Sequence, residues 1–385
     1  MKGDCDLLIL GGGCAGLSLA RELAAFGLRC PSTRILEQRA QYQNDRTWCF
    51  WGDDAALMTH LVDHQWPRVV LRTATDATRF DCAKHPYQMI SSNRFYDDAL
   101  HTIAAAPQLA LEQGVRILAE PNLVGGVWQV ETNAGLRRGK ILIDTRGAAA
   151  AGLPHQAPIL WQSFFGHEVS CEAPVFDPTS VTLMDFIDDP AGRVVFTYLL
   201  PLSAHRALVE LTVFGPSPLT PADLALPLQQ QIRARVGSHA VVVERSEHGI
   251  LPMGLPAQPS TVRPNHVRVG LMHGAARAST GYAFQRIQRW ARDCGARLAA
   301  GAAPIGHAAD PVLLRSMDRL FLSVLRHRPA SAAALFINMF ARSDGDTLVR
   351  FLSDRASLRD YLGIVAALPA LPFVQQLGRN LMRAS

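Results

Sequence analysis

Three glycines near the start of the chain, Gly11, Gly13 and Gly16, have the spacing of a loop that binds phosphate groups. In such loops the first glycine permits a tight turn, the second lets a pyrophosphate approach the backbone, and the third lets a helix pack closely on a strand. The helix that follows would point its free N–H groups and its positive dipole end at the phosphates. We therefore expect a dinucleotide to be contacted by Gly11, Gly13, Cys14, Ala15 and Gly16.

An acid stands where a ribose-binding group is needed. Residues 6–10, DLLIL, predict a buried strand before the glycines, and residues 33–37, TRILE, predict the next strand after the helix. Glu37 ends this second strand about 20 residues after Gly16, the spacing of an acid that accepts hydrogen bonds from a ribose diol. The glycine spacing alone is a weak signal, and a glycine-rich turn with an exposed acid is the alternative.

The glycine motif does not distinguish FAD from NAD, but later segments favour FAD. Residues 140–144, KILID, predict a strand whose last residue, Asp144, resembles the strand-end acid near the adenine side of flavoproteins. The run from Gly270 to Gly274, followed by STGYAF, resembles the turn that meets the ribityl chain and the flavin ring. Arg46 is a candidate partner for a flavin phosphate. The further predicted FAD contacts are Arg46, Asp144, Gly270, His273, Gly274, Thr280 and Gly281.

The order of the expected strands and helices predicts an α/β fold. It comprises a Rossmann-type FAD-binding domain, a second, mixed β-sheet substrate domain and a helical C-terminal region. Aromatic residues and β-type alternation after residue 45 indicate an excursion from the nucleotide domain, and strand-like runs fill 160–245 around one helix at 222–236. The FAD-binding domain is expected to comprise 1–45, 82–150 and 246–305, the substrate domain 46–81 and 151–245, and the helical region 306–385.

Composition and charge limit the kinds of partner and ligand that we expect for this protein. The 385 residues are 48% hydrophobic and 18% charged, which suits a large core, an apolar substrate or a membrane surface. No uncharged apolar run approaches the roughly 20 residues that a transmembrane helix needs. The net charge is +5 with scattered basic residues, so we expect no nucleic-acid partner. Seven dispersed cysteines lack metal-binding spacing and predict reduced thiols, no metal site and a cytoplasmic location.

Several segments carry a resemblance to a known family. The most specific are DRTWCFW at 45–51 and the LPL and VELT runs within 196–214. Supporting segments are WQSFFGHEV at 161–169, VTLMDF at 181–186, STGYAF at 279–284 and FLSDRASL at 351–358. In this order, and over nearly the whole chain, they resemble the lycopene cyclase family, in particular the bacterial lycopene β-cyclases.

This resemblance implies a flavin-dependent cyclisation without net redox change. An acid protonates a terminal double bond of lycopene, or of another ψ-end carotene, a nearby double bond closes a six-membered ring, and loss of a proton leaves a β-ionone end. Reduced FAD beside the developing carbocation lowers the barrier in a water-poor cavity, with NAD(P)H as the implied reductant. Because lycopene is dissolved in lipid, the resemblance also implies a peripheral contact of the protein with a membrane surface. The oligomeric state, and whether one or both ends are cyclised, stay open.

The resemblance also implies catalytic residues. Glu210 in LVELT matches the first acid of the family's FLEET or IEDT segment, whereas Leu211 replaces the second acid. In a strand, Leu208 and Thr212 share the face of Glu210. Asp185 in LMDF is the second catalytic candidate, either as a proton relay or as a residue that positions Glu210.

Apolar residues outside this segment are candidates for a carotene tunnel and for membrane contact. Aromatic faces suit a long, flat polyene. The candidate tunnel residues are Trp48, Phe50, Trp51, Phe164, Phe165 and Phe196. The candidate membrane residues are Leu368, Leu371, Pro372 and Phe373, flanked by Arg379 and Arg383.

Two other functions share the predicted fold. One is an FAD-dependent monooxygenase or isoprenoid reductase, and the other is a flavin-binding carotenoid carrier without catalysis. Hydroxylases of this fold usually have Gly-Asp before the small residues of the flavin turn, where this chain has Gly270-Leu271. A reductase would consume one reductant per product, and a carrier would bind carotene unchanged.

Overall fold

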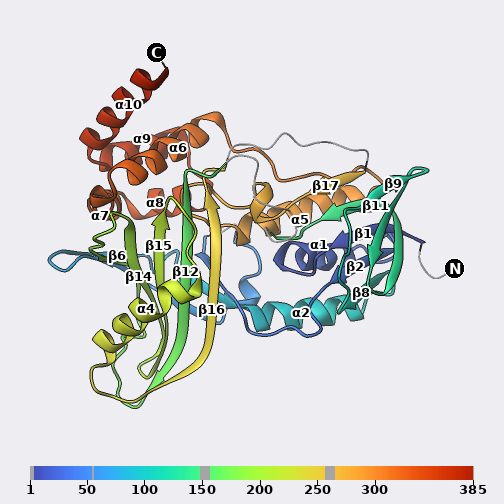
Figure 1. Cartoon of the computed structure of the whole chain (residues 1–385), viewed down its shortest axis with the longest axis horizontal. Helices are drawn as coiled ribbons and strands as arrows, with labels where there is room; N and C mark the ends of the chain where they lie inside the picture. Colours follow the sequence, from blue (N-terminus) through green and yellow to red (C-terminus); the bar gives the residue numbers. More distant parts are fainter. Residues whose placement is uncertain (1–3, 54–55, 148–156, 256–264, 385) are drawn as a thin grey trace.

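The computed structural model describes residues 4–53, 56–147, 157–255 and 265–384. Its first sheet has the strand order β8-β2-β1-β11-β10-β9, and β17 pairs with β11 (Figure 1). The pairs that join β1, β2, β8, β11 and β17 are parallel, whereas β9 and β10 are antiparallel additions. The strands are β1 (Asp4–Leu10), β2 (Thr33–Glu37), β8 (Leu109–Gln113), β9 (Asn122–Val124), β10 (Val127–Thr132), β11 (Gly135–Asp144) and β17 (His266–Arg268).

The apolar sequence of β1 suits its central position in this sheet. Leu7, Leu8, Ile9 and Leu10 are fully buried, as expected of a parallel strand that is covered on both faces. Helices α1, α2 and α5 pack beside one another on this sheet (Figure 1). Their bounds are α1 (Cys14–Ala24), α2 (Ser92–Ala104) and α5 (Phe284–Ala299).

The second sheet has the order β16-β12-β15-β14-β13-β5-β6 and is antiparallel except where β13 pairs with β5. Helix α4 (Pro221–Val236) packs on β12 and β15. The boundary expected at residue 246 lies inside β16, which pairs with β12 as far as Met253, so 246–253 belong to this sheet. The strands are β5 (Arg68–Arg72), β6 (Ala77–Asp81), β12 (Leu160–Cys171), β13 (Ser180–Ile187), β14 (Val194–Ser203), β15 (Arg206–Gly215) and β16 (Val241–Met253).

A small third sheet joins the two large ones. Strand β7 (Tyr87–Ser91) pairs with β3 (Thr47–Trp51) and with β4 (His64–Trp66). Residues 46–81, which were expected to belong to the substrate domain as one segment, are thus divided between two sheets. Strands β3 and β4 belong to the small third sheet, whereas β5 and β6 extend the second sheet. The domain boundary expected at residues 150 and 151 falls outside the described residues.

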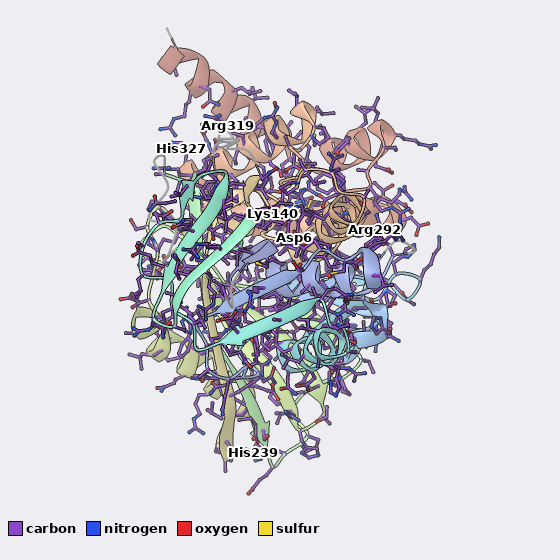
Figure 2. All side chains as sticks on the ribbon, turned by 90° about the vertical axis from the view of Figure 1, so that its right-hand side faces the viewer. Asp6, Lys140, His239, Arg292, Arg319 and His327 are labelled. Atoms are coloured by element: carbon purple, nitrogen blue, oxygen red, sulfur yellow. The ribbon has the colours of Figure 1, made fainter. Side chains whose placement is uncertain are left out.

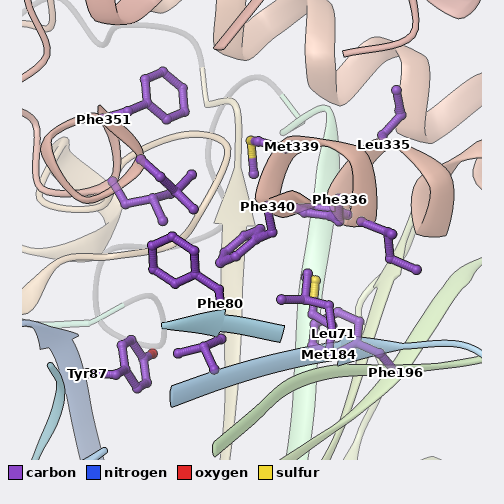
Figure 3. Packing of buried hydrophobic residues seen from close by; sticks show 14 of the residues in the cluster. Leu71, Phe80, Tyr87, Met184, Phe196, Leu335, Phe336, Met339, Phe340 and Phe351 are labelled. Atoms are coloured by element: carbon purple, nitrogen blue, oxygen red, sulfur yellow. The ribbon is translucent and has the colours of Figure 1, made fainter. Parts of the chain in front are cut away.

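Helices fill the C-terminal region, as predicted, and cover one end of the second sheet (Figure 1). In Figure 3, Phe336 and Phe340 of α7 lie against Leu71 of β5 and Phe80 of the edge strand β6, and the rings of Phe80 and Phe340 meet edge-on at 5.8 Å. The helices are α6 (Val312–His327), α7 (Ala332–Arg342), α8 (Gly345–Leu352), α9 (Leu358–Ala367) and α10 (Ala370–Ala384).

Figure 2 looks at the molecule from the end of the first sheet. The Asp6–Lys140 ion pair, 2.8 Å long, lies near the centre of this view. Arg319 of α6 lies toward the top and His239, which follows α4, toward the bottom, so the C-terminal helices and the tip of the second sheet are at opposite ends. Within the described part of the chain, no single helix is long and apolar enough to cross a membrane, whereas α9 and residues 370–380 meet that test only as a pair bent by 101°.

Candidate active site

One cavity of about 1470 Å³ extends from the glycine loop of the first sheet, along the second sheet, to the C-terminal helices. Its wall includes Glu37 of β2, Glu210 of β15 and Phe373 of α10. The length and mixed lining suit two ligands in series, a polar one at the glycine loop and an apolar one beyond it. The predicted cofactor residues in the wall are Gly11, Gly13, Cys14, Ala15, Glu37, Arg46, Gly270, Thr280 and Gly281.

The glycine loop has the geometry that a pyrophosphate requires. Gly11 has φ of +96°, a conformation that other residues rarely adopt. A Cβ on Gly16 would lie 2.0 Å from the carbonyl oxygen of Gly11, so only glycine permits this helix to approach this strand. A Cβ on Gly13 would meet no atom within 4 Å, which leaves the backbone before the N-terminus of α1 accessible from the cavity. The roles predicted for these glycines agree with this geometry.

Glu37 is held in place by the loop that it faces. Its carboxylate accepts hydrogen bonds from the backbone N–H of Gly12 at 2.7 Å and from the backbone N–H of Arg39 at 2.8 Å. The Arg39 guanidinium also pairs with it at 3.0 Å. The carboxylate therefore lies, oriented, in the wall beside the glycine loop, where a ribose diol could donate to it.

The opposite end of the polar part of the cavity has a free hydrogen-bond acceptor. Gly281, with φ of +72°, lies against Gln162 of β12, and both residues are in the cavity wall. The side-chain oxygen of Gln162 is buried and has no hydrogen-bond partner among the residues that the structure describes. A buried acceptor without a partner is costly, so this atom fits a donor on a bound cofactor.

Four predicted cofactor residues lie outside the cavity wall: Gly16, Asp144, His273 and Gly274. Gly16 acts by packing, as described above. Asp144 instead forms an ion pair with Arg146 at 2.8 Å, and the wall includes Arg146 and its neighbours Thr145 and Gly147. His273 belongs to a short 3-10 helix, Leu271–His273, and the direct flavin contact predicted for it is not supported. Arg46 is in the wall, and its guanidinium donates to the carbonyl of His248 at 3.3 Å.

Glu210 is a buried acid in the apolar part of this cavity. It is 7% exposed and accepts one hydrogen bond, from the Thr212 hydroxyl at 2.8 Å. Burial, reinforced by the negative charge of Glu247, raises the pKa of Glu210 from 4.5 to about 8. The alternation that places Thr212 beside Glu210 was predicted correctly. A carboxyl in this environment keeps its proton at neutral pH and can act as an acid.

A second carboxyl, from Glu247 of β16, lies in the same wall and was not predicted. It is 4% exposed. The Arg245 guanidinium pairs with it at 2.5 Å, and the Thr47 hydroxyl donates to it at 2.7 Å. The two partners give this carboxyl one charged and one neutral hydrogen-bond donor.

The sheet register brings the two acids together. Gly166 of β12 is paired with Glu210 of β15 on one side and with Glu247 of β16 on the other, so all three face the cavity. A Cβ on Gly166 would lie 3.1 Å from the Cβ of Glu210 and 3.3 Å from its Cγ, which means that the Glu210 side chain leans over the glycine. Leu211 points to the opposite face, where it packs with Leu224 of α4. An acid at position 211 would therefore not reach this cavity.

Asp185 is not part of the site, which corrects its assignment as a catalytic candidate. It lies outside the cavity wall, and its carboxylate is held by Arg72 at 2.7 Å and by Arg235 at 2.6 Å. These arginines come from β5 and α4, so Asp185 connects the sheet to its covering helix. Its ion pairs give it a structural role instead.

The cavity wall includes three of the six aromatic residues that were candidates for a carotene tunnel. Trp48, Phe164 and Phe196 line the cavity, whereas Phe50, Trp51 and Phe165 do not. Three tyrosines that were not predicted also line it, and their hydroxyls form a chain: Tyr198 donates to Tyr87 at 3.0 Å, and Tyr87 meets Tyr282 at 3.2 Å. The apolar wall continues through α6, α7, α9 and α10.

The arrangement of a dinucleotide loop beside an apolar cavity agrees with the family-level comparison. The model of the family described as "Lycopene cyclase protein" matches residues 6–377. The chain belongs to the lycopene cyclase family. This confirms the resemblance that the DRTWCFW and VELT segments carried.

Relatives within the lycopene cyclase family are distant in sequence. A lycopene beta cyclase of Synechococcus elongatus is 27% identical over 77% of this chain and 72% of its own. A lycopene beta-cyclase of Pseudescherichia vulneris is 26% identical over 95% of both chains.

Solved structures share the fold at lower identity. A geranylgeranyl bacteriochlorophyll reductase-like protein of Thermoplasma acidophilum has a TM-score of 0.63 at 13% identity, covering 98% of this chain and 99% of its own. A p-nitrophenol 4-monooxygenase of Pseudomonas putida has a TM-score of 0.61 at 13% identity, covering 96% and 98%. The predicted α/β fold, with its Rossmann-type domain, mixed second sheet and helical C-terminal region, is thereby confirmed.

Proposed function

We propose that this lycopene cyclase family member cyclises the linear ends of lycopene, or of another ψ-end carotene, to β-ionone rings with FAD bound. The observation that carries the proposal is a buried Glu210, whose pKa is raised by its surroundings, in a cavity that also reaches the glycine loop. The names of the curated relatives support the same substrate class.

Glu210 supplies the proton in the proposed reaction. Transfer of this proton to the terminal double bond forms a C–H bond and leaves a tertiary cation at the neighbouring carbon. The next double bond attacks that cation, closes the six-membered ring and moves the positive charge to a ring carbon. Loss of a ring proton restores a double bond. One proton enters and one leaves, so the product is an isomer and no electrons are exchanged.

The residues of the glycine loop fit FAD. Gly11, Gly13 and the N-terminus of α1 would hold its pyrophosphate, Glu37 its ribose, and Gln162 with Gly281 its ring end. Reduced FAD supplies negative charge beside the developing cation when it is bound. The flavin must be reduced before turnover, and we propose NAD(P)H as the source of electrons. FAD-dependent solved structures of the same fold support the cofactor.

Peripheral contact with a lipid surface belongs to the proposal. Leu371 and Val374 of α10 are exposed, while Leu368 and Phe373 beside them line the cavity. Apolar side chains therefore continue from the cavity wall to the outer face of this helix. Exposed Arg379 is placed to meet anionic headgroups, whereas the Arg383 side chain lies outside the described residues. Carotene would enter from lipid along this face, and the enzyme itself would lie on the cytoplasmic side.

The direct test is expression in a host that accumulates lycopene, followed by chromatography of the pigments. We expect monocyclic or bicyclic carotene in cells that express the chain. Purified enzyme with reduced FAD, in deuterated water, should place one deuterium in each new ring. Lycopene that persists unchanged beside an FAD-loaded protein would contradict the proposal, and an unlabelled cyclic product would contradict its acid-initiated route.

The same experiment separates the alternative functions. A reductase or monooxygenase would change the mass of the carotene and consume one reductant per product. A carrier would copurify with lycopene and leave its spectrum unchanged. Cyclisation is an isomerisation, so the mass stays constant while the number of rings increases.

A further inference from the structure

We propose that Glu247 is a positioning residue of this reaction: a fixed carboxylate, set beside Gly166, that keeps Glu210 in its protonated form. This inference rests on the proposed function, because Glu210 is the proton donor there. The family's segment has both acids in one strand, whereas here the second acid comes from another strand of the second sheet.

The two acids differ in what binds them. Glu247 has a guanidinium, from Arg245, and a hydroxyl, from Thr47, as partners. Among the residues that the structure describes, the hydroxyl of Thr212 is the one hydrogen-bond partner of Glu210. Two buried carboxyls at one site do not both ionise readily, so they share their protons unequally. The cationic partner determines the outcome: the charge stays on Glu247 and the proton on Glu210.

Further contacts hold the Arg245 guanidinium in place, and this guanidinium in turn holds the Glu247 carboxylate in position. The guanidinium pairs with Glu168 of β12 at 2.6 Å and donates to the Thr47 hydroxyl at 2.7 Å. Thr47 belongs to the DRTWCFW segment. This segment therefore reaches the active site through a hydrogen bond to Glu247, in addition to the tryptophan that it places in the cavity wall.

Gly166 gives the pair its spacing. A side chain at this position would stand between the two carboxyls on the same face of the sheet, and its Cβ would already press on Glu210. With glycine there, the negative charge of Glu247 acts on Glu210 through a gap without an intervening side chain. Both acids are buried, so solvent screens this charge less than it would at the surface.

The other titratable groups that face Glu210 are uncharged at neutral pH. Burial raises the pKa of the Cys49 thiol, from β3, to about 12, and that of the Tyr282 phenol, also to about 12. Burial also raises the pKa values of Tyr198 of β14, which is paired with Glu210, and of Tyr87 of β7. Arg245 is the nearby cation, and it is compensated by Glu247 and Glu168. Glu247 is thus the anion that acts on Glu210.

The test is the near-isosteric variant Glu247→Gln in the purified, FAD-loaded enzyme. If the charge raises the proton affinity of Glu210 about tenfold, as nearby like charges commonly do, the rate at pH 8 falls roughly fivefold and the rate near about pH 6 is retained. The control Glu244→Gln removes an exposed acid of the same strand outside the cavity and should leave the profile unchanged.

Infrared difference spectroscopy supplies a readout without turnover. The carbonyl stretch of the protonated Glu210 carboxyl is identified by its loss in Glu210→Gln, and its pH titration is then followed in each variant. We expect the band to disappear at lower pH in Glu247→Gln than in the unsubstituted protein. An unchanged titration overturns the role of Glu247, whatever the substrate is. Failure to cyclise lycopene, with the band shifted as expected, overturns the proposed function instead.

Discussion

Glu210 of β15 and Glu247 of β16 face one cavity from the two sides of Gly166, the β12 residue that is paired with both. Thr212 is the one hydrogen-bond partner recorded for Glu210, whereas Arg245 and Thr47 bind Glu247. The difference in partners accounts for a protonated acid beside a carboxylate. It also explains how a chain with Leu211 at the usual place of the second acid still brings two carboxyls to its active site.

Activity should depend on pH through Glu210. Burial, followed by the charge of Glu247, raises the pKa of Glu210 from 4.5 to about 8. The reactive form is the protonated one, so it is present below about pH 8 and is lost as the pH rises through that value. We expect the rate of lycopene conversion to fall about tenfold for each pH unit above 8. Flavin occupancy is measured at every pH, and a rate that stays flat to about pH 10 would contradict this assignment.

Restoring an acid at position 211 should harm the protein. Leu211 is 2% exposed and packs with Leu224 and Leu228 against α4. Leu211→Glu would bury a carboxyl without a partner, which costs several kcal/mol of folding free energy. We expect a lower melting temperature and no gain in rate, while the control Leu211→Met should cost less than about 1.5 kcal/mol. A faster enzyme of unchanged stability would show that position 211 faces the substrate.

Two glycines of the nucleotide loop should respond differently to alanine. At Gly13 a Cβ meets nothing within 4 Å, so Gly13→Ala should fold normally and bind FAD more weakly, because the methyl group occupies space on the cofactor side. At Gly16 a Cβ would lie 2.0 Å from a backbone oxygen, so Gly16→Ala should also destabilise the fold by about 1–3 kcal/mol. Flavin titration and thermal unfolding of the apoprotein distinguish the two effects. Equal melting temperatures would contradict the packing role of Gly16.

Local patterns predicted the elements that surround the candidate nucleotide site. The glycine spacing, the strand before it and Glu37 after it are set by residues close together in sequence, and each has its expected place in the structure. The face of Glu210 followed from the alternation of a strand, which is also a local property.

Long-range pairing explains what was not predicted. Glu247 lies near Glu210 because β12 pairs with both β15 and β16. No pattern within SEHGILPM predicts the register of β16 on β12. The isolated glycine of WQSFFGHEV was the available signal, because glycine inside a strand often marks a close approach. Asp185 was misassigned for the same reason, since its partners Arg72 and Arg235 are distant in the sequence.

The exposed face of α10 should determine binding to lipid. Leu371 is 66% exposed, so Leu371→Glu should leave the melting temperature unchanged and weaken cosedimentation with anionic liposomes. Leu28, which is 94% exposed in the short helix after α1, provides the matched control Leu28→Glu, for which we expect no loss. Equal loss in both variants would indicate a general effect of charge, and no loss in either would exclude this face.

The most direct measurement is the rate of lycopene cyclisation by Glu210→Gln with reduced FAD bound, compared with the unsubstituted enzyme. Glutamine retains the shape and the hydrogen bond from Thr212 but carries no transferable proton at this position. We expect full flavin occupancy, retained carotene binding and a rate lower by on the order of 10²–10⁴. Cyclisation by this variant at the unsubstituted rate would show that the proton comes from elsewhere.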